Sequence, residues 1–305
     1  MHDTDHTSTS DRSGTAGGAG ADLPDRPSVP ERPRHLPVEI APDTFVIQDT
    51  AGEGVAPVAV HMNSMVIRGV EPVVVDTGAP SNRDRYLEDL FGLVEPADVR
   101  WVFLSHDDVD HYGNVDAVMD LCPNATLITS WFMTERLGAE LRVPPTRWRW
   151  VGDGESFDAG DRVLTAIRPP LYDSPTTRGL FDPRTGVYWA SDCYATPVAT
   201  GTAFVEDLDP EAWREGFISF GTWNSPWVSL VDRDRYLTEC RRVTELPLSA
   251  IAGTHAPTIE ASDLSAAHDM LLRLPGDAVP PQPGQELLEQ IQAAMATAGA
   301  PVRAG

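Results

Sequence analysis

The chain contains no lysine. Its 23 basic residues are all arginine, and against 46 acidic residues they give a formal charge of −23 over 305 residues. Without a lysine amine there is no Schiff base to a carbonyl substrate and no phosphate loop ending in Gly-Lys-Ser/Thr. Nucleic acid is bound through basic patches, and acidic membrane surfaces repel a strongly negative protein. We therefore expect neither nucleic acid nor a membrane as partner.

Cysteine and long apolar runs are also scarce. The three cysteines are widely spaced and form no CxxC pair, which argues against a disulfide framework and favours a reducing cytoplasm. No stretch reaches the roughly 18 apolar residues of a membrane helix. Hydrophobic residues still make up 41% of the chain, enough for a sizeable core.

The composition divides the chain into three parts. Residues 1–36 are an acidic, Gly- and Pro-rich tail with few large aliphatic residues, which predicts disorder, and without an apolar stretch they do not resemble a signal peptide. Residues 37–260 are expected to form the main domain. Residues 261–305 are expected to add C-terminal helices that pack on the same domain and end in a frayed terminus.

Within residues 37–260, strand-like runs come first and then alternate with helical patterns, which predicts a layered mixed sheet flanked by helices. Strands are expected at 44–48, 58–61, 64–68, 72–76, 99–105, 126–129, 147–151, 162–167, 187–191 and 250–253. Helices are expected at 84–93, 113–122, 130–137, 209–217, 232–244, 262–273 and 284–297.

One loop concentrates the chemistry. The buried strand at 99–105 leads into His106-x-Asp108-x-Asp110-His111, with two histidines and three acids within six residues. Imidazole and carboxylate together suit zinc, iron or manganese. A solvated acidic loop at the start of a helix is the plain alternative, but it does not require two histidines at this spacing.

Two later residues stand in similar contexts. Asp192 and His255 each follow a predicted strand, and sites gather at strand ends in mixed sheets. Alone, either would be read as a turn aspartate or a structural histidine. Beside the loop they become candidate metal ligands.

Together these residues resemble the metallo-β-lactamase fold, an α+β four-layer αββα sandwich whose signature is H-x-H-x-D-H followed by a His, a bridging Asp and a final His. The acid at the second position resembles the branch that contains flavodiiron and oxygen-binding diiron proteins. The resemblance implies a first site with His106 and Asp108, and a second with Asp110, His111 and His255. Asp192 would bridge two divalent ions, iron or zinc. The resemblance also implies a buried acid, Asp76, behind the metal loop.

One histidine of the pattern is missing. Where the fold carries a third ligand of the first site, the chain reads Arg168-Pro-Pro170-Leu-Tyr172-Asp173, and Pro170 cannot coordinate. Tyr172 or Asp173 can substitute or shape the pocket, or one metal alone is tightly bound. A Pro-rich loop at the pocket rim is an equal alternative.

Two functions follow from this pattern. The main hypothesis is a metallo-hydrolase acting on an ester, thioester, lactone or amide of a small molecule, with Asp110 and Asp192 as catalytic residues that orient a metal-bound hydroxide. The alternative is a non-haem diiron protein that binds or reduces dioxygen or nitric oxide. Since no Gly-rich flavin loop is found, its electrons are expected from an external donor, and the resemblance implies a homodimer.

Other interpretations have less support. Asp76-Thr77-Gly78 matches one half of an aspartic-protease dyad, but a second copy is absent. No G-x-S-x-G nucleophile elbow occurs, which argues against a serine hydrolase. A member of the fold kept only for binding is a third possibility, suggested by the missing histidine.

Overall fold

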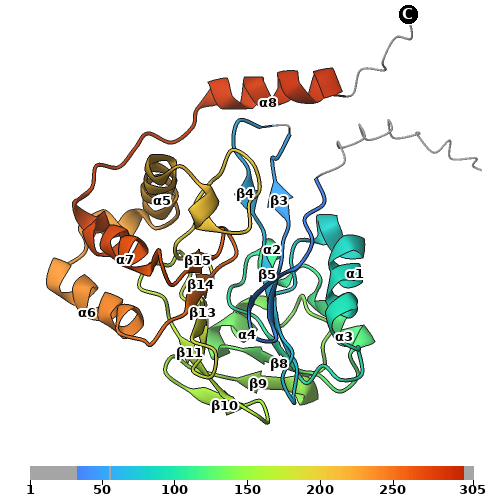
Figure 1. Ribbon diagram of the computed structural model, residues 1–305. Coiled ribbons are helices and arrows are strands. Elements are labelled where there is room, and N and C mark those ends of the chain that lie inside the picture. The colour runs from blue at the N-terminus through green and yellow to red at the C-terminus, as the bar shows by residue number, and fades with distance from the viewer. Residues whose placement is uncertain (1–32, 55, 299–305) are drawn as a thin grey trace, which may run out of the picture.

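The structure is a computed structural model that describes residues 33–54 and 56–298. Two β-sheets pack face to face, and helices cover the outer face of each (Figure 1). This is the predicted four-layer αββα sandwich. Most of the predicted tail, residues 1–32, lies outside the described residues, and the division into residues 37–260 and 261–305 stays a prediction.

The first sheet has seven strands in the order β1-β2-β5-β6-β7-β8-β9. Its strands are β1 (Val38–Ala41), β2 (Thr44–Ile47), β5 (Ser64–Ile67), β6 (Val73–Val75), β7 (Trp101–Phe103), β8 (Thr126–Thr129) and β9 (Trp148–Trp150). From β6 to β9 the neighbours are parallel. These strands are short runs of β-branched and aromatic residues, and β5 and β6 are buried throughout.

The second sheet has six strands in the order β10-β11-β12-β13-β14-β15. They are β10 (Ser156–Asp158), β11 (Val163–Ile167), β12 (Gly179–Asp182), β13 (Val187–Trp189), β14 (Ala250–Ala252) and β15 (Ile259–Glu260). The pair β13 and β14 is parallel, and the other neighbours are antiparallel. A small separate pair is formed by β3 (Thr50–Ala51) and β4 (Val60–His61).

Helices from the first half of the chain cover the first sheet. They are α1 (Arg83–Leu93), α2 (Val109–Tyr112), α3 (Val115–Leu121) and α4 (Trp131–Leu137). The later helices are α5 (Pro210–Asn224), α6 (Arg233–Thr244), α7 (Leu264–Arg273) and α8 (Gln285–Ala298). Short 3-10 turns lie at Pro80–Asn82, Pro145–Arg147, Val205–Asp207, Pro226–Leu230 and Leu274–Gly276.

Three hydrophobic cores hold the layers together. Between the two sheets, Phe103 of the first faces Phe157 and Trp189 of the second. A second core joins the first sheet to α1, α3 and α4, and a third joins the second sheet to α5, α6 and α7. Burial of these side chains is the main force that fixes the strand ends relative to one another.

The structure differs from the expected elements in several places: strands β1, β3, β10, β12 and β15 were not expected, and two helices differ. Helix α5 continues to Asn224, past the expected end at residue 217, and includes both Gly216 and Gly221. A Cβ at Gly221 would lie 3.1 Å from Leu171, so this glycine permits close packing within the helix. Of the two C-terminal helices, α7 packs on the second sheet through Ala267 and Leu271, whereas α8 lies away from both sheets in Figure 1 and none of its residues up to 296 is buried.

None of the helices in the described part of the chain has the length and hydropathy to span a lipid bilayer. The three cysteines are buried free thiols, which agrees with the predicted absence of disulfides.

Candidate metal centre

The predicted site residues meet at one edge of the sandwich. Strands β6 and β7 run parallel, as do β13 and β14, so their carboxyl ends point the same way. Asp76 follows β6, Asp192 lies three residues past β13, and His106 and His255 each lie three residues past β7 and β14. Sequence segments separated by up to 179 residues thus converge through strand direction within each sheet together with the packing of the two sheets.

The loop after β7 bends as it reaches the site. Asp108 has extended backbone angles and precedes α2, which carries Asp110 and His111. The extended part sends His106 and Asp108 to one side, and the helical turn sends Asp110 and His111 to the other. His106 and His111 are fully buried, whereas Asp108 has 61% of its side chain exposed. The cluster therefore opens to solvent beside Asp108.

Site two consists of His111, His255 and Asp110. Their candidate ligand atoms lie within 4.8 Å of one another, and His255 Nε2 lies 3.4 Å from Asp110 Oδ2. Two imidazoles and one carboxylate converging in this way form a facial set that suits iron(II).

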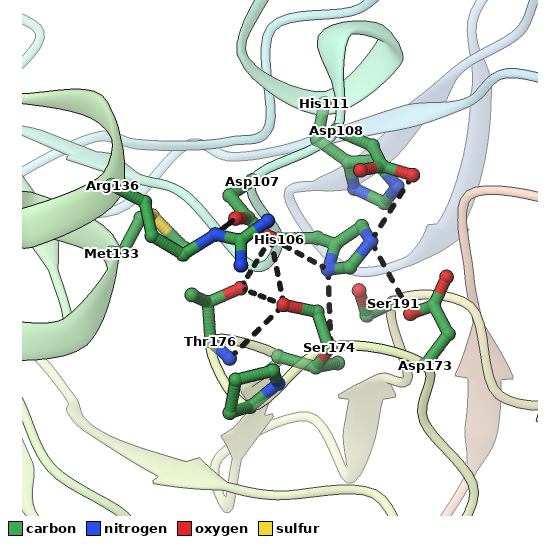
Figure 2. Close-up of polar contacts among 12 residues, drawn as sticks. His106, Asp107, Asp108, His111, Met133, Arg136, Asp173, Ser174, Thr176 and Ser191 are labelled. Carbon is green, nitrogen blue, oxygen red and sulfur yellow. Dashed lines mark hydrogen bonds and ion pairs between the residues drawn. The ribbon is translucent and has the colours of Figure 1, made fainter.

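Site one consists of His106, Asp108 and Asp173. His106 Nε2 lies 3.4 Å from Asp108 Oδ2 and 3.3 Å from Asp173 Oδ1. Figure 2 shows both carboxylates directed toward the His106 ring, Asp173 from the loop between β11 and β12. Asp173 thus lies where the sequence pattern lacks a histidine.

Asp192 lies between the two sites. Its Oδ2 is 3.6 Å from His106 Nε2, while its Oδ1 is 2.9 Å from His111 Nε2 and 3.6 Å from His255 Nε2. The two oxygens of one carboxylate therefore face different sites, which is the geometry that a bridging ligand needs.

The candidate ligand atoms are arranged to bind metal ions, not to hydrogen-bond with one another. The Nε2 atoms of His106 and His111 and Oδ1 of Asp192 are buried and have no hydrogen-bond partner, although oppositely charged atoms lie within 3.6 Å. Buried polar atoms almost always make a hydrogen bond, because leaving one unpaired costs about 1–3 kcal/mol. Several ligand atoms that converge without hydrogen-bonding to one another indicate a cation-binding site.

All three histidines are held through Nδ1. His106 Nδ1 lies 3.0 Å from Thr177 Oγ1, and His255 Nδ1 donates to the His61 carbonyl at 2.6 Å. His111 Nδ1 lies 3.0 Å from Asp76 Oδ2. Anchoring Nδ1 fixes the ring orientation and leaves Nε2 available as the ligand atom.

Asp76 lies behind site two and accepts several hydrogen bonds there, in the position that the resemblance implies. The carboxylate is inaccessible to solvent and accepts hydrogen bonds from the Ser105 backbone at 2.7 Å, the Ser105 hydroxyl at 2.5 Å and Trp189 Nε1 at 3.0 Å. Asp76 and Ser191 both have positive φ, 58° and 53°. Such backbone conformations cost about 1–3 kcal/mol each and concentrate at functional sites.

The charged side chains of this cluster shift one another's pKa values strongly. Burial alone lowers the pKa of His106, but the neighbouring carboxylates of Asp108, Asp173 and Asp192 outweigh it and raise the pKa to about 10. His111 behaves in the same way, with its pKa raised by Asp192 and Asp76 against the effect of burial. Burial raises the pKa of Asp192, yet the three histidines outweigh it and lower the pKa far below the usual value. The carboxylates of this cluster therefore favour positive charge on the groups that face them.

A network that the sequence did not reveal supports site one (Figure 2). Asp107 Oδ1 accepts hydrogen bonds from Ser174 Oγ at 2.8 Å and Thr176 Oγ1 at 2.6 Å, and its Oδ2 pairs with Arg136 of α4. Asp107 thereby ties the loop of His106 to the loop of Asp173. The signal in the sequence was a third acid in the metal loop, next to a histidine.

Replacing Asp107 with alanine is expected to loosen site one. The change leaves buried hydroxyls without an acceptor, which costs about 1–3 kcal/mol, and frees the Asp173 loop, which lowers metal affinity about 10–100-fold. Urea unfolding and anaerobic metal titration measure the two effects. Asp107→Asn keeps the acceptor and should lose less, and unchanged affinity in the alanine variant would show that the network does not position site one.

Tyr172, the other candidate near Pro170, does not join the metal cluster. Its ring lies 5.1 Å from that of Trp227, whose Nε1 donates to the Tyr172 carbonyl, and the Arg168 guanidinium lies 5.2 Å from the ring centroid. These residues line a separate surface pocket of about 510 Å³. Of the two substitutes that the sequence allowed, the structure places Asp173 in the site and Tyr172 in this pocket.

Two histidines outside the metal cluster also have defined contacts. His35, in the predicted tail, pairs with Glu53 at 2.8 Å, and Arg34 pairs with Asp89. His61 is buried, with its Nε2 3.0 Å from the Thr202 carbonyl. His61 supports His255 through its backbone, a role that no side-chain pattern can show.

His61 should make stability depend on pH. Burial lowers its pKa to about 4, only partly offset by the bond to Thr202, so folding disfavours the protonated form. Its contribution is complete above about pH 6.5 and is lost as the pH falls toward 4, by about 3 kcal/mol. Urea unfolding of metal-free protein at pH 7, 5.5 and 4.5 measures this loss. His61→Gln should lack that part of the pH dependence, and equal pH dependence in both proteins would contradict the assignment.

With this geometry in place, comparison with known proteins decides the family. Residues 60–233, more than half of the chain, match the family described as ODP family beta lactamase. The chain belongs to this ODP family. The match confirms the predicted metallo-β-lactamase fold and the predicted flavodiiron branch.

The relatives of this chain have names that refer to redox proteins. A diflavin flavoprotein of Nostoc sp. is 32% identical over 148 residues, covering 48% of this chain and 25% of the relative. A nitric oxide reductase of Moorella thermoacetica is 24% identical over 147 residues, covering 48% and 37%. The flavodiiron protein of Giardia intestinalis has the same fold, with a TM-score of 0.69 at 16% identity over 80% of this chain and 60% of that one. The chain spans about a quarter to a third of these curated flavoproteins and somewhat more of the reductase.

These relatives overturn the main functional prediction. The sequence pattern favoured a metallo-hydrolase, but the related proteins are named diflavin flavoproteins, nitric oxide reductases and flavodiiron proteins. The hydrolase prediction is therefore wrong, and zinc finds no support. The motif alone could not decide, because a metal-bound hydroxide and a redox-active metal pair use the same kinds of ligand.

Proposed function

We propose that this protein is a non-haem diiron redox enzyme that binds and reduces dioxygen or nitric oxide, with electrons from an external donor. The observation that carries the proposal is the placement of six donor side chains around Asp192, with the Nε2 atoms of His106 and His111 buried and unpaired. The support from relatives is their names, which refer to flavodiiron and nitric oxide reductase proteins.

In this proposal, His111, His255 and Asp110 would hold one ion, and His106, Asp108 and Asp173 would hold the other. Asp192 would be the ligand shared by both. A bound iron pair would supply the redox-active centre that passes electrons from the external donor to a diatomic gas. The chain supplies a fixed, mostly buried set of donors, and the exposed side of Asp108 leaves an approach from solvent.

The surrounding residues control protons and orientation. Asp76 keeps the His111 ring in place by accepting a hydrogen bond from its Nδ1, the His61 carbonyl accepts one from His255 Nδ1, and Thr177 Oγ1 holds His106 Nδ1. Metal binding displaces the Nε2 protons that the carboxylates favour in the metal-free protein. A homodimer and a cytoplasmic location stay predictions.

Iron loading and gas reactivity test the proposal together. Apoprotein is loaded with iron(II) without oxygen, desalted, analysed for metal, and mixed with dioxygen or nitric oxide while its absorption spectrum is recorded. We expect retained iron, a new visible absorption band, and gas consumption with an artificial electron donor. His111→Ala, treated identically, is the control. Consumption no faster in the wild type than in this variant would overturn the proposal.

A further inference from the structure

The two halves of the metal centre offer different donor atoms. Site two has two imidazoles, His111 and His255, and one carboxylate of its own, Asp110. Site one has one imidazole, His106, and two carboxylates of its own, Asp108 and Asp173. With Asp192 shared, site one is dominated by oxygen, whereas site two has equal numbers of nitrogen and oxygen donors.

The position of Asp173 is built into the structure. The residues after it are held from two directions: Ser174 and Thr176 bond to the buried Asp107, and the Pro175 carbonyl accepts hydrogen bonds from Arg168 at 3.1 Å and Arg178 at 3.2 Å. The Asp173 side chain is only 21% exposed.

An independent observation supports a cation-binding role for site one. The Nε2 atom of His106 belongs to a side chain that is 1% exposed, has no hydrogen-bond partner, and faces the carboxylates of Asp108 and Asp173 (Figure 2). Its other nitrogen is held by Thr177. The imidazole is therefore fixed with its free donor atom directed at two acids.

Donor type sets how strongly a site distinguishes iron(II) from manganese(II). Divalent iron binds nitrogen and oxygen sites more tightly than manganese, but carboxylate-rich sites suit manganese, and a two-histidine, one-carboxylate set suits iron(II). The preference for iron should therefore be weaker at site one than at site two.

We propose that the two sites select different metals, with iron(II) taken up at site two and manganese(II) accepted at site one when both are available. This inference rests on the proposed dinuclear centre and deepens it. The selecting residue is Asp173, because a histidine in its place would give both sites the same donor set.

Competitive loading tests the selection without measuring activity. Apoprotein receives at least two equivalents each of iron(II) and manganese(II) per chain, without oxygen, and is desalted. Elemental analysis gives the metal content, and anomalous diffraction at the manganese and iron edges locates each metal. We expect about one of each metal per chain, with manganese beside Asp173 and iron beside His255.

Asp173→His supplies the decisive variant. It gives site one a second imidazole, so we expect bound manganese to fall about tenfold or more and iron to rise toward two per chain. Asp234→His, on the exposed start of α6, adds a histidine elsewhere and should leave the metal content unchanged. If Asp173→His does not fold, Asp173→Asn should lose manganese while keeping one iron, and unchanged manganese there would overturn the inference.

The possible failures are distinguishable. Two irons and no manganese in the wild type, or manganese at site two, would overturn the selection and leave the diiron proposal standing. If the wild type retains neither metal at these residues, the proposed function itself fails.

Discussion

Replacing Asp192 with alanine is expected to abolish metal binding at both sites at once. The two carboxylate oxygens face His106 on one side and His111 and His255 on the other. Loss of any other single ligand removes a donor from one site, whereas loss of Asp192 removes a donor from each. We expect affinity at both sites to fall more than about 100-fold, since even residues that only support ligands contribute 10–100-fold.

Metal content after anaerobic loading and desalting measures this effect. Asp182→Ala is the matched control, because Asp182 is also a buried aspartate of the second sheet but pairs with Arg162 at 2.8 Å instead of facing the cluster. The control should lose stability and keep its metal. Equal metal content in Asp192→Ala and the wild type would refute the bridging assignment.

The second large effect is expected at Asp76, on stability. Asp76→Ala removes the acceptor of four hydrogen bonds, from two groups of Ser105, from His111 and from Trp189, in a place that solvent does not reach. Removing one member of a buried charged network costs about 3–5 kcal/mol. Alanine also tolerates the positive φ at this position poorly. For a domain of this size we expect the melting temperature to fall by about 10 °C.

Asp76→Asn separates charge from packing. Asparagine keeps the size and one acceptor oxygen and tolerates positive φ, so thermal unfolding should show a smaller loss than in the alanine variant. Metal binding at site two should still weaken, because the His111 ring loses its anionic partner. An alanine variant as stable as the wild type would contradict the role assigned to Asp76.

The metal loop could be predicted from sequence because its ligands are contiguous. His106, Asp108, Asp110 and His111 lie within six residues after one buried strand, so the pattern is visible without knowledge of tertiary contacts. Asp192 and His255 were found only because each follows a strand. The parallel pairing of β13 with β14 brings these two residues to one edge of the second sheet, and the packing of the two sheets brings that edge to the loop after β7.

The ligand set of site one could not be completed from sequence. Tyr172 and Asp173 are adjacent, and either side chain can reach a nearby site from a flexible loop. Tertiary packing separates the two, because the Tyr172 ring packs beside Trp227 and Arg168 while the Asp173 carboxylate faces His106. These tertiary contacts leave no recognisable pattern in the spacing of residues along the sequence.

The missed elements have similarly local explanations. Strand β12 begins at Gly179 directly after a Pro- and Thr-rich loop, and a Cβ on this glycine would overlap the Tyr188 hydroxyl. Glycine is therefore required by close approach to the neighbouring strand, although it usually weakens a strand. Strand β15 has only two residues, too few for alternation to be recognised.

The most direct test of this account is anomalous diffraction from crystals of the iron-loaded protein, recorded at the iron and zinc edges. The account predicts two metal peaks about 3.5–4 Å apart on either side of Asp192, with iron between His111 and His255. A peak that responds only at the zinc edge, or no peak among these residues, would contradict it.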